Sequence, residues 1–129
     1  MGFRVYSRDE PSLYAPMISS DARFVVWPGI GAQVANMNYV RMEPGERNRP
    51  HAHAGSEDTI VILSGRGTVD DLTNGTRHEF EAGDVIHVAP GVTHAVCADR
   101  GTGVESVGGP CPPDWAMLRA LGYERPASV

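Results

Sequence analysis

The chain has 129 residues, of which 41% are hydrophobic, and this is enough for one domain with a single buried core. Its 16 acidic residues outnumber its 11 basic residues, all of them arginine, and the formal net charge is -5. This balance argues against a nucleic-acid partner, because phosphate binding needs a basic surface. The first residues hold no apolar stretch of secretory length, and no apolar run is long enough to cross a bilayer, so we expect a cytoplasmic protein without a membrane partner.

Fifteen glycines and ten prolines indicate frequent turns and favour many short strands over long helices. Residues 1–22 are polar and rich in turns, and we expect an arm there with little structure of its own. The pattern of residues 23–112 is extended, with its strongest hairpin signal at Asn74 and Gly75. The expected strands are 23–27, 33–42, 58–65, 65–72, 76–88 with a tight turn inside, 93–99 and 102–108.

A helix is expected only in the last part of the chain, residues 113–129, which would form a short helix and a tail. Trp115, Leu118 and Leu121 recur at the spacing of one helical face, and Gly122 is a plausible stop. We interpret this apolar face as a packing surface. The sequence therefore predicts one β domain between an N-terminal arm and a C-terminal helix.

Three histidines form the most informative pattern. His51 and His53 are two residues apart, so on an extended segment their side chains project to the same side. With His94, they can bind one metal ion. A carboxylate close by, Glu57 or Asp58, would complete a set of nitrogen and oxygen donors. Such a set suits Fe, Mn, Ni, Cu or Zn as a divalent ion, and it leaves coordination positions for substrate.

These residues resemble the two motifs of the cupins, G-x5-H-x-H-x3or4-E-x6-G and G-x5-P-x-G-x2-H-x3-N. Gly45, His51, His53 and Gly65 fit the first motif. Gly83, Gly91 and His94 fit the second, in which Ala89 and Ala98 replace the usual Pro and Asn. The resemblance covers most of the chain. It implies an all-β double-stranded β-helix, a jelly-roll cupin barrel, with the short C-terminal helix outside it.

The carboxylate position departs from the family pattern. The glutamate Glu57 is one residue too early relative to Gly65, and Asp58 has the expected spacing. We favour Asp58 as the fourth ligand, because a slip of one residue along a continuous strand turns a side chain to the other face. A β-bulge would instead bring Glu57 inside.

The cupin resemblance implies a metal-dependent enzyme for a small-molecule substrate, and we expect an oxygenase acting on a small organic acid or a phenolic compound. A redox-neutral isomerase, lyase or epimerase and a non-catalytic ligand-binding protein are the alternatives. His87 and Tyr39 are candidates for moving protons. Further candidates for substrate recognition are Gln33, Asn36, Asn38, Arg41, Arg47, Arg49 and Arg66.

Single-domain cupins commonly pair, and this resemblance implies a homodimer. The N-terminal arm carries Phe3, Val5 and Tyr6, which could add a strand to a second copy of the chain.

Overall fold

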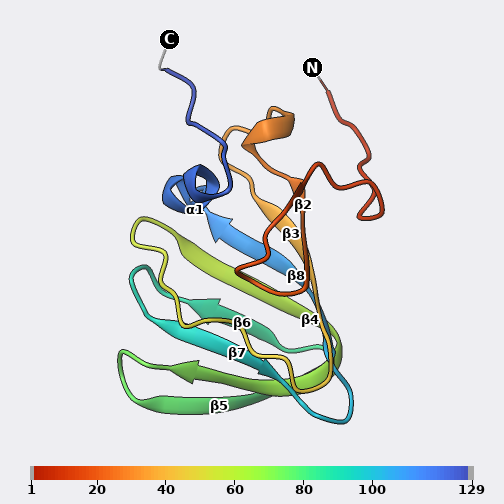
Figure 1. The fold of residues 1–129 in the computed structure, drawn as a ribbon, viewed down its shortest axis with the longest axis vertical. Helices are drawn as coiled ribbons and strands as arrows, with labels where there is room; N and C mark the ends of the chain where they lie inside the picture. The colour runs from red at the N-terminus through yellow and green to blue at the C-terminus, as the bar shows by residue number, and fades with distance from the viewer. Residues whose placement is uncertain (1, 128–129) are drawn as a thin grey trace.

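The computed structural model describes residues 2–127, which form antiparallel strands stacked into a barrel with one short helix at the end where both termini lie (Figure 1). The strands are β1 (Leu13–Tyr14), β2 (Asp21–Val26), β3 (Met37–Met42), β4 (Glu57–Asp71), β5 (Thr76–Glu81), β6 (Val85–Val88), β7 (His94–Ala98) and β8 (Val104–Cys111). A 3-10 turn, η1 (Pro28–Ile30), follows β2, and the helix α1 (Trp115–Ala120) follows β8. The predicted all-β double-stranded β-helix is confirmed.

Strand β4 belongs to both layers of the barrel. Its first half, residues 57–65, pairs with β8 on one side, and residues 58–61 pair with β6 on the other. Its second half, residues 66–71, pairs with β5 and also with β7. One layer therefore has the order β1-β2-β3-β8-β4-β6, and the other consists of β5, β4 and β7.

The sequence predicted two strands where the structure has the single strand β4 of 15 residues. Gly65 allows the chain to pass from one layer to the other without a break. It has a φ of 83°, and a Cβ atom at this position would lie 2.0 Å from the carbonyl oxygen of Gly103. Only glycine tolerates both the backbone conformation and the close approach, so the predicted boundary at residue 65 is a crossing point within one strand.

The predicted hairpin at Asn74 and Gly75 is present, and it joins β4 to β5 with Asp71 opposite Thr76. Its loop has four residues, 72–75, and the Asp71 carboxylate accepts hydrogen bonds from the backbone and side-chain nitrogens of Asn74 within it. These two hydrogen bonds between Asp71 and Asn74 stabilise the loop, as hydrogen bonds from Asp and Asn side chains do in many turns.

Two apolar clusters hold the fold together. The first fills the space between the layers and consists of Met42, Ile62, Val69, Phe80, Val96, Ala98 and Val104. The second joins the predicted arm, strand β2 and helix α1, and consists of Ala15, Ala22, Phe24, Trp27 and Leu118 with half-buried neighbours that include Trp115 and Leu121. The predicted helical face is therefore a packing surface, and part of residues 1–22 is packed against the C-terminal helix. Within residues 2–127, no helix has the length and apolar character needed to span a membrane.

The crossing at Gly65 generates a stability prediction. Gly65→Ala should destabilise the fold by about 3 kcal/mol or more, because the new methyl group meets the backbone at Gly103. Gly83→Ala is the matched control: Gly83 also has a positive φ, of 96°, but its Cβ position faces open space. The control should lose only about 1 kcal/mol. Urea unfolding of both variants measures the difference, and equal losses would contradict a crossing that depends on close approach.

Candidate metal centre

Two backbone hydrogen bonds bring His51 and His94 together. The N–H of His51 donates to the carbonyl oxygen of His94 at 3.0 Å, and the N–H of His94 donates to the carbonyl oxygen of His51 at 2.9 Å. In such a reciprocal antiparallel pair the two side chains lie on the same face. The imidazole centroids are accordingly 4.3 Å apart. The first and second histidine motifs are thus joined by the main chain.

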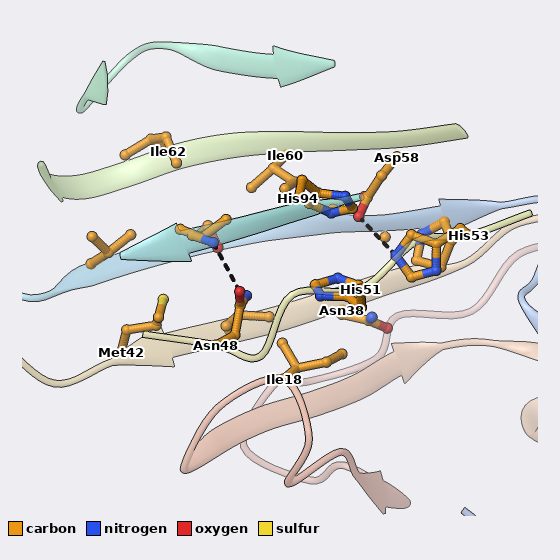
Figure 2. A pocket seen from close by; sticks show the side chains of 17 residues that line it. Ile18, Asn38, Met42, Asn48, His51, His53, Asp58, Ile60, Ile62 and His94 are labelled. Atoms are coloured by element: carbon orange, nitrogen blue, oxygen red, sulfur yellow. Dashed lines mark hydrogen bonds and ion pairs between the residues drawn. The ribbon is translucent and has the colours of Figure 1, made fainter. Parts of the chain in front are cut away.

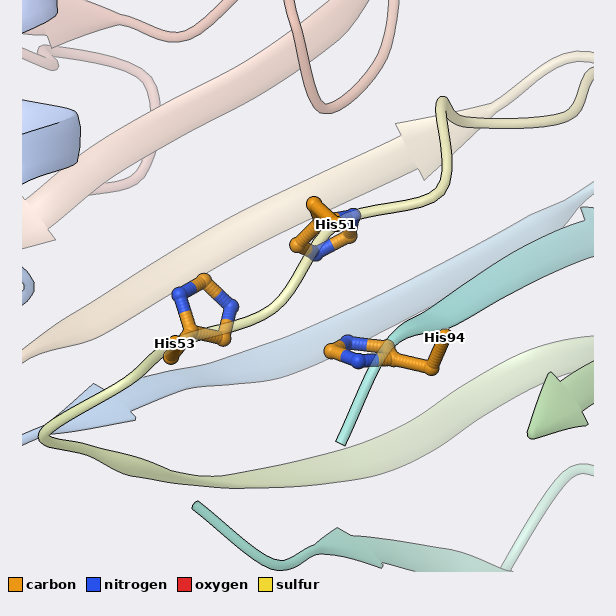
Figure 3. Close-up of side chains that lie close together, drawn as sticks. All are labelled: His51, His53 and His94. Atoms are coloured by element: carbon orange, nitrogen blue, oxygen red, sulfur yellow. The ribbon is translucent and has the colours of Figure 1, made fainter. Parts of the chain in front are cut away.

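His53 completes the cluster from two residues farther along. Its carbonyl oxygen accepts a hydrogen bond from the N–H of Gly91, at 3.0 Å, which holds the segment against the turn before β7. The alternation of an extended segment then returns the His53 ring to the face of His51. One ligand atom from each of the three histidines lies within 4.8 Å of the others, and the three rings converge (Figure 3).

Hydrogen bonds at Nδ1 of two of the rings determine which ring nitrogen has a lone pair available for a metal ion. Nδ1 of His51 donates to the carbonyl oxygen of Arg49 at 2.8 Å, and Nδ1 of His94 donates to that of Val92 at 2.9 Å. A carbonyl oxygen only accepts, so each Nδ1 carries the proton of the neutral ring. The lone pair of each ring is therefore on Nε2, which is the form that binds a metal ion.

His53 differs because its ring lies between two carboxylates. Nδ1 is 2.6 Å from Oδ2 of Asp114, and Nε2 is 3.5 Å from Oδ2 of Asp58. Burial by itself lowers the pKa of His53, but the hydrogen bonds and charges of the two carboxylates outweigh burial and raise this pKa to about 9. Burial and the neighbouring imidazoles lower the pKa of His51. The carboxylate of Asp114 also fixes the orientation of the His53 ring, and its hydrogen bond with His53 lowers the pKa of Asp114.

The two candidate carboxylates point in opposite directions. Asp58 is 7% exposed and lines the same cavity as the histidines, and its Oδ1 atom has no hydrogen-bond partner (Figure 2). Glu57 lies on the outer face of β4, where its Oε1 accepts a hydrogen bond from Nε2 of His87 at 2.7 Å. The pairing register runs without a shift through residues 57–62, so no bulge turns Glu57 inward. Asp58 therefore stays our candidate for the fourth ligand.

This donor set fits a divalent transition metal. Two histidines present free lone pairs toward the centre of the cluster, and a third joins them within 4.8 Å. A buried carboxylate oxygen without a partner, such as Oδ1 of Asp58, costs free energy that a bound cation would recover. His51, His53 and His94 would hold the ion, with Asp58 beside them.

The cavity beside the histidines is small and mainly apolar, with a volume of about 50 Å³. This volume corresponds to the room of roughly three to five water molecules, so the cavity accepts only a compact ligand. Its apolar walls come from both layers and from the arm, and they include Ile18, Val40, Met42, Ile60, Ile62, Val96 and Val104 (Figure 2). No arginine is among the described residues that line it.

The two residues predicted to move protons lie outside this cavity. Tyr39 is on the opposite face of β3, where its hydroxyl donates to Glu105 and its ring lies under the guanidinium groups of Arg8 and Arg23. The half-exposed imidazole of His87 interacts with Glu57 on the outside of β6. A role for Tyr39 or His87 in proton transfer stays a prediction, and within residues 2–127 no hydrogen bond or ion pair joins either side chain to the histidine cluster.

Of the residues predicted to recognise a substrate, only Asn38 lines the cavity. Arg47 forms an ion pair with Asp70 at 3.1 Å, and Arg66 forms one with Asp99 at 3.3 Å. Asn36 is buried beside the cavity wall. Gln33, Arg41 and Arg49 are exposed.

Asp114 is the functional candidate that sequence reasoning did not find. Its Oδ2 contacts His53, and its Oδ1 accepts a hydrogen bond from the N–H of Met117 at 3.1 Å, which caps helix α1. Asp114 directly precedes helix α1, a position at which a carboxylate commonly caps the first turn. Its second contact spans 61 positions of the chain and has no local sequence signal.

The comparisons with known proteins identify the family. The family model described as Cupin domain matches residues 38–105, which is more than half of the chain. The chain therefore belongs to the cupin family, as its histidine motifs predicted.

The relatives of this chain include plant proteins and microbial structures. It is 30% identical over 74 residues to germin-like protein 3-5 of Oryza sativa subsp. japonica, a match that covers 53% of this chain and 33% of the relative. It thus spans about a third of the length of the curated relatives it matches. The polyketide cyclase RemF from Streptomyces resistomycificus has a similar fold, with a TM-score of 0.69 and 21% identity over 88% of this chain and 83% of that one.

An RmlC-like cupin family protein with a double-stranded β-helix from Methanocaldococcus jannaschii is also similar, with a TM-score of 0.67 and 18% identity. That match covers 92% of this chain and 98% of the other. At these identities the structures support the fold alone.

The opposite orientations of Asp58 and Glu57 give a paired prediction. Asp58→Asn should weaken Zn²⁺ binding about tenfold or more, because it removes the buried charge beside the histidines. Glu57→Gln should leave the affinity within about twofold, because exposed charges are screened by solvent. Calorimetric titration with Zn²⁺ measures both. A larger loss in Glu57→Gln would contradict the inward position of Asp58.

The double contact of Asp114 gives a second prediction. Asp114→Asn keeps one oxygen to cap helix α1, but that oxygen cannot serve both Met117 and His53. We expect Zn²⁺ affinity to fall about ten- to a hundredfold, with little change in the far-ultraviolet circular dichroism. Asp71→Asn, at the end of β4 beside the hairpin loop, is the control for loss of a carboxylate elsewhere. Equal affinities in Asp114→Asn and the unaltered protein would show that His53 needs no support from Asp114.

Proposed function

We propose that this cupin is a metal-dependent enzyme for a small, mainly apolar substrate that carries an acidic oxygen, and that it is an oxygenase. The observation that carries the proposal is the convergence of three histidines on a small apolar cavity. His51, His53 and His94 would hold the ion, and the apolar walls would exclude bulk water from the bound substrate. When bound there, a divalent ion would supply Lewis acidity and, in the case of iron, a way to activate O₂.

The charge of the site argues against a substrate with two negative charges. A divalent ion carries two positive charges and the Asp58 and Asp114 carboxylates one negative charge each, so with neutral imidazoles the site has a net charge of about zero. A phenol, an enol or a monocarboxylic acid adds at most one negative charge there. A dianion would leave an uncompensated charge, because none of the described residues that line the cavity is an arginine. Phenolic compounds therefore fit this cavity better than small diacids.

A redox-neutral reaction is the second candidate. It is favoured by Oδ1 of Asp58, a buried acceptor without a partner in the cavity wall. If the three histidines alone hold the ion, this oxygen is free to accept a proton from the substrate. The likeness to a polyketide cyclase supports the cupin fold and does not choose between the two reactions.

The test is turnover by protein without metal and by protein loaded separately with Fe, Mn, Ni, Cu or Zn as divalent ions. The substrates are a panel of phenols, 1,3-diketones and small mono- and dicarboxylic acids, and O₂ consumption and products are followed separately. We expect metal-dependent conversion of a phenol or diketone, with O₂ consumed by the iron form. Equal conversion without metal would contradict the proposal. Product without O₂ consumption would support the redox-neutral candidate, and tight binding without conversion under every metal would support a binding protein.

We also propose that two copies pair through the N-terminal arm. Phe3 and Val5 are 95% and 93% exposed, and such apolar side chains gain free energy when a second surface covers them. Light scattering at tens of micromolar protein should give the mass of a dimer. The double variant Phe3→Ser and Val5→Ser should shift the mass toward that of the monomer, and a monomeric unaltered protein would contradict the proposal.

A further inference from the structure

The side chain of Asn38 is a buried amide that forms no hydrogen bond stabilising the fold within the described residues. Asn38 is 3% exposed and lies on the inner face of β3, from which Val40 and Met42 also reach the cavity. Its Oδ1 atom has no hydrogen-bond partner. A buried amide oxygen without a partner costs about 1–3 kcal/mol, and an apolar residue of similar size would avoid this cost.

The other amide of the cavity wall, Asn48, shows what a structural asparagine does in this protein. The side-chain Oδ1 of Asn48 accepts a hydrogen bond from the backbone N–H of Val96 at 2.8 Å (Figure 2). The backbone N–H of Asn48 donates to the carbonyl oxygen of Val96 at 3.0 Å. Asn48 thus fastens the loop before His51 to strand β7. Asn38 has no comparable contact through Oδ1, so a structural explanation accounts for Asn48 and leaves Asn38 unexplained.

Gly109 provides the space for Asn38. A Cβ atom at Gly109 would lie 3.3 Å from Nδ2 of Asn38 and 3.1 Å from Nδ2 of Asn36, which is tight for both amides. Asn36 donates from Nδ2 to the carbonyl oxygen of Pro110 at 3.2 Å, and it does not line the cavity. Of these two amides, only Asn38 therefore faces the histidine side of the wall.

We propose that Asn38 determines substrate specificity through a hydrogen bond with a hydroxyl group of the substrate. This proposal rests on the proposed function, in which one acidic oxygen of the substrate is held at the histidine cluster. Neither Oδ1 nor Nδ2 of Asn38 forms a hydrogen bond with another described residue, so a hydroxyl group of the substrate, which can both donate and accept, matches this side chain. No arginine or other cationic side chain apart from the histidines is among the described residues that line the cavity, so that second group is uncharged. The substrate class is then a small phenol or enol that carries a second hydroxyl group.

The experiment compares the binding of phenol, catechol and resorcinol to the Zn²⁺-loaded protein, in which no redox reaction competes. Catechol and resorcinol present the second hydroxyl at two different positions on the same small ring. We expect Asn38→Leu to weaken the binding of at least one of these diols about five- to tenfold and to leave phenol unchanged, because one hydrogen bond is lost. Calorimetric titration gives the affinities.

Asn36→Leu is the matched control, because Asn36 is a second buried amide beside Gly109 and does not line the cavity. It should not change the affinity ratio of diol to phenol. Asn38→Leu should also unfold at a higher temperature than the unaltered protein in the absence of ligand, because it removes an unpaired buried acceptor. A structural amide would give the opposite shift.

Should Asn38→Leu fail to fold, the side-chain amide resonances of Asn38 in the unaltered protein give a second readout. They should move farther when a diol binds than when phenol binds, because either aromatic ring shifts nearby resonances but only the diol adds a hydrogen bond. Equal loss of diol and phenol affinity in Asn38→Leu would overturn the role of Asn38 while the proposed function stands. Asn38 amide resonances that move no farther with the diols than with phenol would do the same. If none of the three compounds binds to the metal-loaded protein, the proposed function itself fails for phenols.

Discussion

The reciprocal backbone hydrogen bonds between His51 and His94 are the constraint on which the site depends. They join two segments 43 positions apart in the chain, and they place both imidazoles on one face of an antiparallel pair. His53 follows from the alternation of the same segment, and Gly91 holds it in place through its N–H. The cluster is thus built by the main chain, and the side chains need only hydrogen bonds at Nδ1 to present Nε2.

Polar groups around the cluster divide into those that support the fold and those that do not. Asn48 and Asp114 each make two hydrogen bonds that tie a loop or a helix to the barrel. Asp58 and Asn38, which line the cavity, and Asn36, which does not, each keep a buried side-chain oxygen without a partner. A stable fold retains such groups at a cost, and for Asp58 and Asn38 the position beside three histidines gives that cost a functional reason.

Local patterns in the sequence predicted much of this structure, and long-range packing decided the rest. The spacing of His51 and His53, the hairpin at Asn74 and the helical face around Leu118 depend on neighbouring residues, and the structure has all three. The continuity of β4 through residue 65 depends on the approach of a distant segment, which no local pattern reports. The contact of Asp114 with His53 has the same origin. Tyr39 has a chemically attractive side chain, but strand alternation turns it away from the cavity that Asn38 lines.

Metal content measured by elemental analysis tests the central claim most directly. After reconstitution with Zn²⁺ and removal of excess ion, the unaltered protein should hold one ion per chain. His51→Ala, His53→Ala and His94→Ala should each lose most of it. His78→Ala is the control, because His78 is exposed and, within the described residues, its side chain forms a hydrogen bond with Thr76 alone. The control should keep its ion. Unchanged metal content in all three cluster variants would contradict a metal site at the three histidines.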